Sequence, residues 1–309
     1  MTLIDSVNNA PVHKETPGFW KRFSKSSTPY WFIAPFFIGF IIFQLLPIIF
    51  SGVLSFADWD GMKPIQFSGL DNFKTLFADE RFWNAFRNTL WITLSCSILG
   101  TIGSTALAVL LEKVPDRMSS ILRVIFFLPS VTSVVVITYV FKQLYNTDSG
   151  FINLTLTQFG LPAQNWLNDP KLALMALIVM LIWAGLGWDA LIITAGLRSI
   201  PQEIYDASRV DGASGWSEFR FITFPLLRPT LTFVLVTSVI YLWGLFAQPQ
   251  LLTAGGPLRA TQTVALYLYE AGFRYHKFGY ASAIAIALSF VMFLSSYINF
   301  RVMKSDVRY

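Results

Sequence analysis

Long hydrophobic stretches, almost free of charge, alternate with polar segments along this 309-residue chain. A bilayer core is spanned by about 20 residues of α-helix, and an isolated span must be helical to satisfy its own backbone hydrogen bonds. Six stretches have about this length. The pattern therefore predicts an all-α, polytopic membrane protein with six transmembrane helices. The predicted spans are residues 30–57, 88–111, 124–141, 172–197, 229–246 and 278–300, within a transmembrane domain of residues 30–301.

Composition supports a membrane protein over a soluble one. Hydrophobic residues make up 54% of the chain and charged residues only 13%, whereas an ordinary soluble domain is about 25% charged. The net charge of +5 comes from basic residues that flank hydrophobic stretches, so we expect membrane lipid around the chain and no nucleic-acid partner. The single cysteine, Cys96, lies inside a hydrophobic stretch, which excludes a disulfide framework and a thiolate metal site.

The distribution of basic residues predicts the orientation. Fourteen Lys and Arg residues lie on the face that carries both termini, and nine lie in the three loops of the opposite face. Because cytoplasmic loops are enriched in Lys and Arg, both termini are assigned to the cytoplasm. Residues 1–29 have no apolar core, so they are expected to be a cytoplasmic tail and not a cleaved signal peptide. Residues 302–309 form the second tail.

The loop between the fourth and fifth spans, residues 198–228, has signals for a short helix. We expect Ser199 to cap it, with Pro201 in its first turn. Glu203 and Asp206 would stabilise its positive N-terminal end, and Gly212 would end it in the left-handed conformation.

A second helical arm is expected to begin at Ser214 and to end at Pro225. The small residues at the turn between the two arms would let another backbone approach closely. The loop would then be a helix–turn–helix pair at the cytoplasmic membrane surface. The alternative is an interfacial connector that only joins two spans.

The spacing in this loop resembles the EAA motif of binding-protein-dependent ABC importer permeases. The residues Asp206-Ala207-Ser208 are followed by Gly212 and then by Ile222-Thr223-Phe224-Pro225, with both spacings of the motif. Asp stands for Glu, Ser for Ala and Phe for Leu, and each change keeps the charge, the size or the apolar character.

Three further segments are similar to the carbohydrate-importing branch of that family, in the same order. They are FSGLDNFKTLF at 67–77, the stretch from FLPSV to GFIN at 127–153, and LLTAGGPLRATQT with the residues that follow it at 251–273. Together the four segments extend the resemblance from about residue 30 to residue 300.

The resemblance implies a prokaryotic inner-membrane protein that works in an assembly. Its cytoplasmic loop would dock on a separate ATPase, two copies of which drive alternating access. A second, usually different permease and an extracytoplasmic sugar-binding protein complete the assembly. ATP and Mg²⁺ would bind the ATPase partners, and this chain would bind no cofactor and not be an enzyme. The absence of a G-x-x-x-x-G-K-[ST] motif agrees with this.

The resemblance also implies which residues contact the ATPase. The expected ATPase-coupling residues are Glu203, Tyr205, Asp206, Ala207, Ser208, Asp211, Gly212, Ile222 and Pro225.

Candidates for contact with a solute lie in the fourth and fifth spans and just after the fifth. The candidates are Trp183, Asp189, Tyr241, Trp243, Gln248 and Gln250. Asp189 is the one charged residue within any predicted span, and such acids line cavities or pair with other groups. It would accept hydrogen bonds from sugar hydroxyls or gate a cavity, or it would bond to the partner permease as a packing residue. Trp243 would stack on a sugar or belong to an interfacial aromatic belt.

Other functions are poorly supported. An intramembrane enzyme would need nucleophiles or metal ligands, but the two histidines, His13 and His276, lie outside the spans and no H-E-x-x-H or G-x-S-x-G motif occurs. A channel or secondary transporter would have no use for the cytoplasmic loop. Within the same family, a permease for a glycerophosphodiester or a polyol is the alternative to a sugar permease.

Overall fold

The computed structural model describes residues 19–302, with side chains from residue 30 onward. Most of the tail assigned to residues 1–29 and nearly all of the tail at 302–309 therefore lie outside the described residues. The chain divides into two units, residues 1–50 and 51–309, and each is described by itself. Helices form nearly all of the regular structure, which confirms the predicted all-α class.

The first unit is one long, apolar helical segment. Helix α1 (Phe19–Phe40) passes through a π-helical turn, η1 (Ile41–Leu45), into α2 (Leu46–Leu54). Its apolar part, Tyr30–Leu54, has a mean hydropathy of 2.4 and is long enough to cross a membrane. Helix α1 begins at Phe19, before the predicted span at residue 30. The charged residues between these two positions do not prevent a helix, because a helix that continues outside the hydrocarbon can carry charge.

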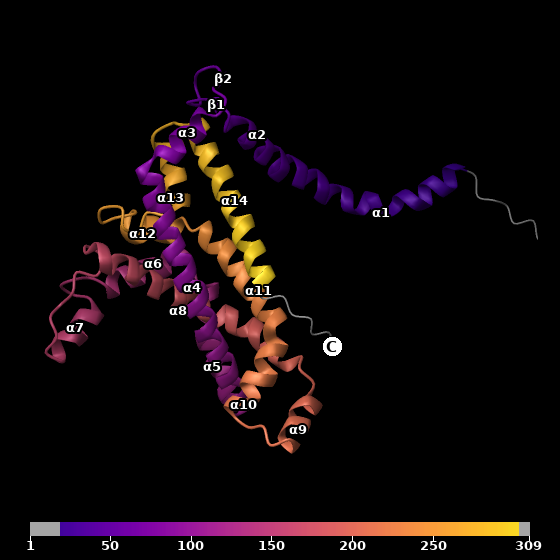
Figure 1. Ribbon diagram of the computed structural model, residues 1–309, viewed down its shortest axis with the longest axis vertical. Coiled ribbons are helices and arrows are strands. Elements are labelled where there is room, and N and C mark those ends of the chain that lie inside the picture. The colour runs from indigo at the N-terminus through magenta and orange to yellow at the C-terminus, as the bar shows by residue number, and fades with distance from the viewer. Residues whose placement is uncertain (1–18, 303–309) are drawn as a thin grey trace, which may run out of the picture. The chain divides into compact units, whose positions relative to one another are not determined.

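Four long helices form the body of the second unit (Figure 1). They are α4 (Glu80–Lys113), α8 (Pro170–Arg198), α11 (Phe224–Trp243) and α14 (Phe278–Val302), and each is apolar and long enough to cross a membrane. Where the bilayer lies along them stays a prediction. The helix that contains the fifth predicted span begins earlier than expected, because the arm before it, from Trp216, is continuous with α11.

Small residues allow the long helices to pack closely. Ser104 on α4 donates a hydrogen bond of 3.0 Å to the backbone oxygen of Leu186 on α8, and a Cβ at Gly103 would touch Leu186 as well. On α8, a Cβ at Gly196 would collide with the side chain of Thr230 on α11. Helices in lipid associate through such close contacts, because burial of apolar surface from lipid gives little energy.

The third predicted span is broken. Instead of one helix over 124–141, α5 (Asp116–Val131) and α6 (Val134–Leu144) meet at an angle of 101°. Thr132 and Ser133 have extended backbone between the two helices. Pro129, in the last turn of α5, has no N–H to donate to the preceding turn, so the helix is weakened where it ends.

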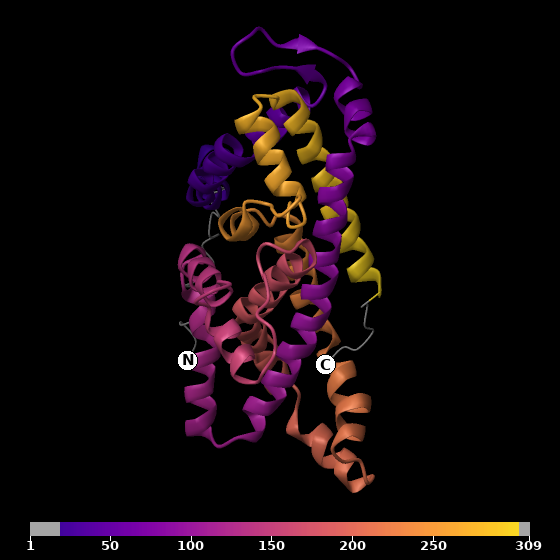
Figure 2. The same cartoon turned by 90° about the vertical axis from the view of Figure 1, so that its left-hand side faces the viewer.

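Short elements surround the ends of the long helices. A two-residue antiparallel pair, β1 (Ala57–Asp58) with β2 (Gln66–Phe67), precedes α3 (Asp71–Ala78). This strand pair was not predicted. In both ribbon views, these elements lie at one end of residues 51–302, and α9, described below, lies at the opposite end (Figures 1 and 2).

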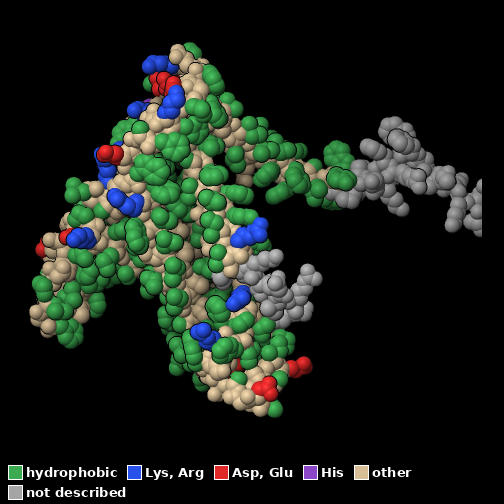
Figure 3. Space-filling view, viewed as in Figure 1, with side chains coloured by type: hydrophobic (Ala, Val, Ile, Leu, Met, Phe, Trp, Pro, Cys, Tyr) green, Lys and Arg blue, Asp and Glu red, His purple; other side chains and the backbone are tan. Residues whose placement is uncertain are grey.

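Three more short helices belong to the region between α6 and α14. They are α7 (Phe151–Gln158), α12 (Ala247–Thr253) and α13 (Val264–Tyr269), and α13 continues into the π-helical turn η3 (Glu270–Arg274). The space-filling view shows mostly hydrophobic side chains over the visible face of residues 51–302 (Figure 3). That surface is suited to lipid or to other membrane subunits.

An ion-pair network joins the start of α4 to η3. Arg81 forms a salt bridge with Glu270, whose side chain is 5% exposed. Arg81 also donates to the side-chain oxygen of Gln262 at 3.1 Å and lies over the ring of Tyr267 at 4.7 Å. Arg274 bonds to Glu270 at 3.2 Å. The side-chain amide of Gln262 also donates to Glu270, at 2.5 Å. Two cations and an amide thus surround one buried carboxylate and hold three segments together.

A second carboxylate, that of Asp79, holds α13 and α14 to the same end of α4. Burial alone would raise the pKa of Asp79. The hydroxyls of Tyr267 and Tyr280 and the backbone N–H of Arg81 donate hydrogen bonds to its carboxylate, and they hold that pKa below its ordinary value. The charged form of Asp79 is therefore the one that this end of the fold stabilises.

We expect Glu270→Ala to destabilise the protein, because it leaves Arg81 partly buried without its partner. Breaking such a pair costs about 3–5 kcal/mol, which corresponds to a fall of about 6–10 °C in the unfolding midpoint. Thermal unfolding of the purified chain in detergent measures the effect. Glu80→Ala, an exposed acid beside Arg81, is the control and should change the midpoint little. Equal midpoints for the two variants would contradict the role of the network.

Candidate functional site

The predicted coupling loop, residues 199–225, forms two helical arms, but their boundaries differ from the prediction. The first arm is α9 (Gln202–Val210), and the second contains α10 (Trp216–Glu218) and the π-helical turn η2 (Phe219–Thr223). The second arm runs directly into α11, as Figure 2 shows at the lower end of the ribbon. The loop is thus one free helix followed by the extended foot of a long helix.

Two predicted boundaries are wrong. Ser199 does not cap α9, because its hydroxyl donates to the carbonyl of Gly196 at 2.7 Å and ends α8 instead. Pro201 is the residue before α9 and makes no side-chain cap. Pro225 does not end the second arm. It lies in the first turn of α11, directly after η2, where the wider π-helical turn accommodates a residue without an N–H donor.

The predicted end of α9 at Gly212 is confirmed. Gly212 has φ of +81°, in the left-handed region that favours glycine. The N–H of Gly212 donates to Arg209 O at 3.1 Å, and the N–H of Ala213 donates to Ser208 O at 2.9 Å. This pair of bonds is the Schellman motif of helix ends. A Cβ at Gly212 would meet no atom within 4 Å, so its surroundings are open.

The inner face of α9 is fastened to the foot of α11. The hydroxyl of Tyr205 lies 3.2 Å from that of Thr223. Ser208 is buried and donates to Tyr205 O at 2.8 Å, and Arg209 forms an ion pair of 3.5 Å with Glu218. The structure therefore gives Tyr205 and Ser208, which were predicted to couple to the ATPase, places on the inner side of α9.

The outer face of α9 and its turn is open and acidic. Five of the predicted coupling residues are exposed, namely Glu203, Asp206, Ala207, Asp211 and Gly212. Ile222 and Pro225, in the second arm, are half-buried.

Two apolar side chains of the same loop were missed. Val210 is 88% exposed and Trp216 is 70% exposed. Large apolar residues in an otherwise polar loop are the signal that could have identified them. An open acidic face bordered by exposed apolar side chains is suited to contact with another protein.

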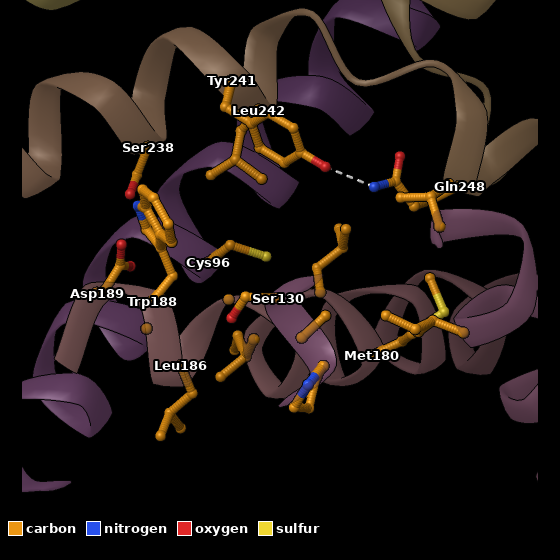
Figure 4. A pocket seen from close by; sticks show the side chains of 18 of the residues that line it. Cys96, Ser130, Met180, Leu186, Trp188, Asp189, Ser238, Tyr241, Leu242 and Gln248 are labelled. Atoms are coloured by element: carbon orange, nitrogen blue, oxygen red, sulfur yellow. Dashed lines mark hydrogen bonds between the residues drawn. The ribbon is translucent and has the colours of Figure 1, made fainter. Parts of the chain in front are cut away.

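A cavity of about 400 Å³ lies among α4, α5, α6, α8, α11 and α12, and we call it the central cavity (Figure 4). Three of the predicted solute contacts line it: Asp189, Tyr241 and Gln248. Gln248 donates a hydrogen bond of 2.6 Å to the hydroxyl of Tyr241. In the close view, Asp189 and Ser238 lie toward one end of the cavity and Gln248 toward the other.

The wall of the cavity depends on a close approach of α5 to α8. A Cβ at Gly187 would collide with the backbone carbonyl of Phe126 on α5. Beside this contact, the rings of Trp188 and Phe127 are stacked, with centroids 6.0 Å apart. Glycine at this position therefore brings the bent pair α5–α6 against the helix that carries Asp189.

Asp189 forms no hydrogen bond or salt bridge with any other residue that the structure describes. A carboxylate without a partner in a membrane cavity is costly unless another group completes it. Both interpretations, contact with a solute and contact with a partner permease, therefore remain open at this point.

The remaining predicted contacts lie elsewhere. Trp243 is 1% exposed and packs on Phe86 with ring centroids 5.2 Å apart. This position contradicts both roles expected for Trp243, because a core residue neither stacks on a solute nor faces the membrane–water interface. Trp183 is absent from the cavity lining and packs beside Phe141. Gln250 lines a different hollow.

The cavity contains polar residues that the prediction missed. Trp188, Thr237 and Ser238 line it together with the three predicted contacts. Thr237 and Tyr241 are four residues apart on an otherwise apolar helix, and this spacing, which places both on one face, could have shown them. Trp188 had no comparable signal, because tryptophan is common in membrane helices. The lining thus combines hydroxyls, an amide, a carboxylate and an aromatic ring.

We expect Gly187→Ala to disturb the cavity wall, because the added methyl group would overlap the backbone of α5. The overlap should cost about 1–3 kcal/mol. The control is Gly185→Ala on the same helix, where a Cβ would meet no atom within 4 Å and alanine favours the helix. Thermal unfolding in detergent compares them, and a midpoint for Gly187→Ala at or above that of the control would refute the close approach.

Comparisons with known proteins agree with the resemblance noted in the sequence. Residues 100–308 match the model of the family described as the binding-protein-dependent transport system inner membrane component. The lactose transport system permease protein LacF of Rhizobium radiobacter is 33% identical over 275 residues, with 87% of this chain and 91% of that protein covered. The arabinooligosaccharides transport system permease protein AraP of Bacillus subtilis is 31% identical over 305 residues, covering 97% and 96%.

A solved structure has the same fold. A chain in the crystal structure of a bacterial alginate ABC transporter, in complex with an alginate-bound periplasmic protein, superposes with a TM-score of 0.82. It is 24% identical, and the alignment covers 94% of this chain and 99% of that one.

Proposed function

Because the chain belongs to the binding-protein-dependent transport system inner membrane components, we propose that it is a permease subunit of an ATP-driven sugar importer. It forms part of the translocation pathway in the membrane, and ATP is hydrolysed by separate subunits that hold ATP and Mg²⁺. The observation that carries the proposal is the α9 helix. It offers an exposed face to a partner and is fastened to a helix that lines the central cavity.

The contacts of α9 supply a physical path from one end of the molecule to the cavity. The bonds of Tyr205 to Thr223 and of Arg209 to Glu218 tie α9 to the foot of α11. The helix that begins there runs without a break to Trp243 and carries Thr237 and Tyr241 into the cavity. A partner that displaces α9 therefore moves a wall of the cavity.

We propose the following assembly. The acidic face of α9 lies in the cytoplasm and docks on one ATPase subunit, and a second, different permease provides the other half of the pathway and contacts the second ATPase. The apolar segment Tyr30–Leu54 is suited to contact with lipid and with that second permease. An extracytoplasmic binding protein delivers the solute at the opposite end.

The lining of the cavity favours a neutral sugar. Hydroxyl, amide and carboxylate groups bond to sugar hydroxyls, and the ring of Trp188 offers a surface for the apolar face of a sugar. No Lys or Arg lines the cavity, but Asp189 does, so an anionic glycerophosphodiester would meet a negative charge with no cation to offset it. The relatives named for lactose and arabinooligosaccharides support a sugar. A neutral polyol is the second candidate.

The docking role of α9 is tested by the double variant Glu203→Lys/Asp211→Lys. Both side chains are exposed, and neither side chain bonds to Arg209, whose ion pairs with Asp206 and Glu218 are kept. The fold should therefore survive, while the reversed charges should repel the ATPase. Losing such charge contacts costs about 2–5 kcal/mol, which predicts at least a tenfold loss of binding-protein-stimulated ATPase activity in proteoliposomes.

Asp116→Lys, which reverses an exposed acid outside the loop, is the matched control and should keep full stimulation. Normal stimulation in the double variant would show that α9 does not dock through these acids.

The role of Asp189 is tested by replacing it with alanine and with asparagine. If its carboxylate contacts sugar, Asp189→Ala should lower uptake at least fivefold while the assembly purifies intact, and Asp189→Asn should retain more activity because an amide still accepts hydrogen bonds. The measurements are uptake of labelled sugar and the subunit composition after purification. Loss of the second permease from the purified assembly would show instead that Asp189 holds the subunits together.

A further inference from the structure

A second hollow, of about 570 Å³, lies outside the central cavity, and we call it the outer hollow. It is formed by the end of α6 with the residues that follow, by the segment before α8, and by α12 with the turn after it. Its volume is within the range of about 300–1,000 Å³ that is usual for small-molecule sites. The hydrogen-bonding side chains in its lining are Tyr139, Lys142, Gln143, Tyr145, Asn146, Thr147, Asn168, Gln250 and Thr253.

Five of these nine polar side chains have no partner among the residues that the structure describes. Tyr145, Asn146, Thr147 and Thr253 bond within the protein. The other five, Tyr139, Lys142, Gln143, Asn168 and Gln250, bond through their side chains to no described residue. The amides of Gln143 and Asn168 are exposed and that of Gln250 is half-buried, so a ligand in the outer hollow can reach them.

Gln250 shows this need most clearly. Its side-chain oxygen is buried and has no hydrogen-bond partner among the described residues. Such a group costs about 1–3 kcal/mol until a partner satisfies it. A ligand in the outer hollow that donates to this oxygen would recover that cost.

Two glutamines of helix α12 line different spaces. Gln248 lines the central cavity and Gln250 lines the outer hollow. Residues two positions apart on a helix point about 200° away from each other, so α12 forms a partition between the two spaces. Helix α6 borders both of them, with Thr138 in the central cavity and Lys142 in the outer hollow.

We propose that the outer hollow is a second sugar-binding site, which holds a neutral sugar unit on the far side of α12 from the central cavity. This proposal rests on the proposed function and adds a site to it. The unpaired amides of Gln250, Gln143 and Asn168 bond to the hydroxyls of that sugar. The ring of Tyr139, which is 70% exposed, covers an apolar face of it.

The chemistry of the lining distinguishes a sugar from other ligands. No carboxylate lines the outer hollow, so a metal cation or an amine has no charged partner there. One Lys among neutral amides does not provide the paired donors that phosphate or carboxylate usually takes. Neutral amides beside an exposed aromatic ring match a polyhydroxylated ring with one apolar face.

The experiment measures occupancy directly, with a cysteine as reporter. The one natural cysteine, Cys96, is buried, so a cysteine at Leu251, which is 39% exposed and lines the outer hollow, should dominate the reaction with a maleimide. The complete transporter carrying Leu251→Cys is reconstituted in proteoliposomes. Uptake and maleimide reaction are measured with lactose, maltotriose and arabinotriose, in the presence and absence of the binding protein.

We expect the transported sugar to slow the maleimide labelling of Leu251→Cys in the absence of the binding protein. The control is Ser149→Cys, an exposed position outside the lining, whose labelling the sugar should not slow. Adding Gln250→Ala should raise the half-protecting sugar concentration about five- to tenfold, since one or two hydrogen bonds are lost. Gln158→Ala, an exposed glutamine outside both spaces, should not change it.

Two results would overturn the second site while leaving the proposed function intact. One is uptake of a sugar that gives no protection at Leu251→Cys. The other is protection only when the binding protein is present, which would make a segment of that protein the occupant. If the unaltered transporter takes up none of the three sugars, the proposed function itself fails, and the second site fails with it.

Discussion

In a bilayer, every backbone N–H and C=O group needs a partner within the protein, and this constraint determines the architecture. It makes the long apolar stretches helical, and it confines irregular backbone to places where other protein covers it. The break between α5 and α6, at Thr132 and Ser133, lies beside the central cavity, which Thr132 lines. Gly187 on α8 lies against the backbone of Phe126, so the interrupted span forms a wall of that cavity, while Val131 and Val135 on its outer face stay exposed.

The two ends of residues 51–302 are held by different contacts. At one end, the salt bridges of Glu270 and the tyrosine bonds of Asp79 fasten α4, η3, α13 and α14 together. At the other end, α9 bonds to the foot of α11 through Tyr205 and Arg209, and Ile204 packs on the apolar cluster that α4, α8 and α11 share. Its hydrogen bond and its ion pair to the rest of the chain are thus made to the helix that continues to the central cavity.

Much of the fold could be predicted from hydrophobic pattern, because the cost of burying polar groups in lipid is large and local. The end of α9 was also predictable, since only glycine adopts the conformation of Gly212 at little cost. The cap at Ser199 and the end at Pro225 were not, because each depends on a neighbouring helix that competes for the same residue. The predicted roles of Trp243 failed for a related reason: whether an aromatic ring faces core, lipid or solute is decided by tertiary packing against residues such as Phe86.

The central claim is that this chain transports only together with an ATPase that it does not contain. Affinity purification of the tagged chain from its native membrane, followed by reconstitution and measurement of uptake with and without ATP, tests it most directly. The account predicts that an ATP-binding subunit and a second permease elute with the chain, and that uptake requires both ATP and a binding protein. A chain that purifies alone and transports solute without ATP would contradict it.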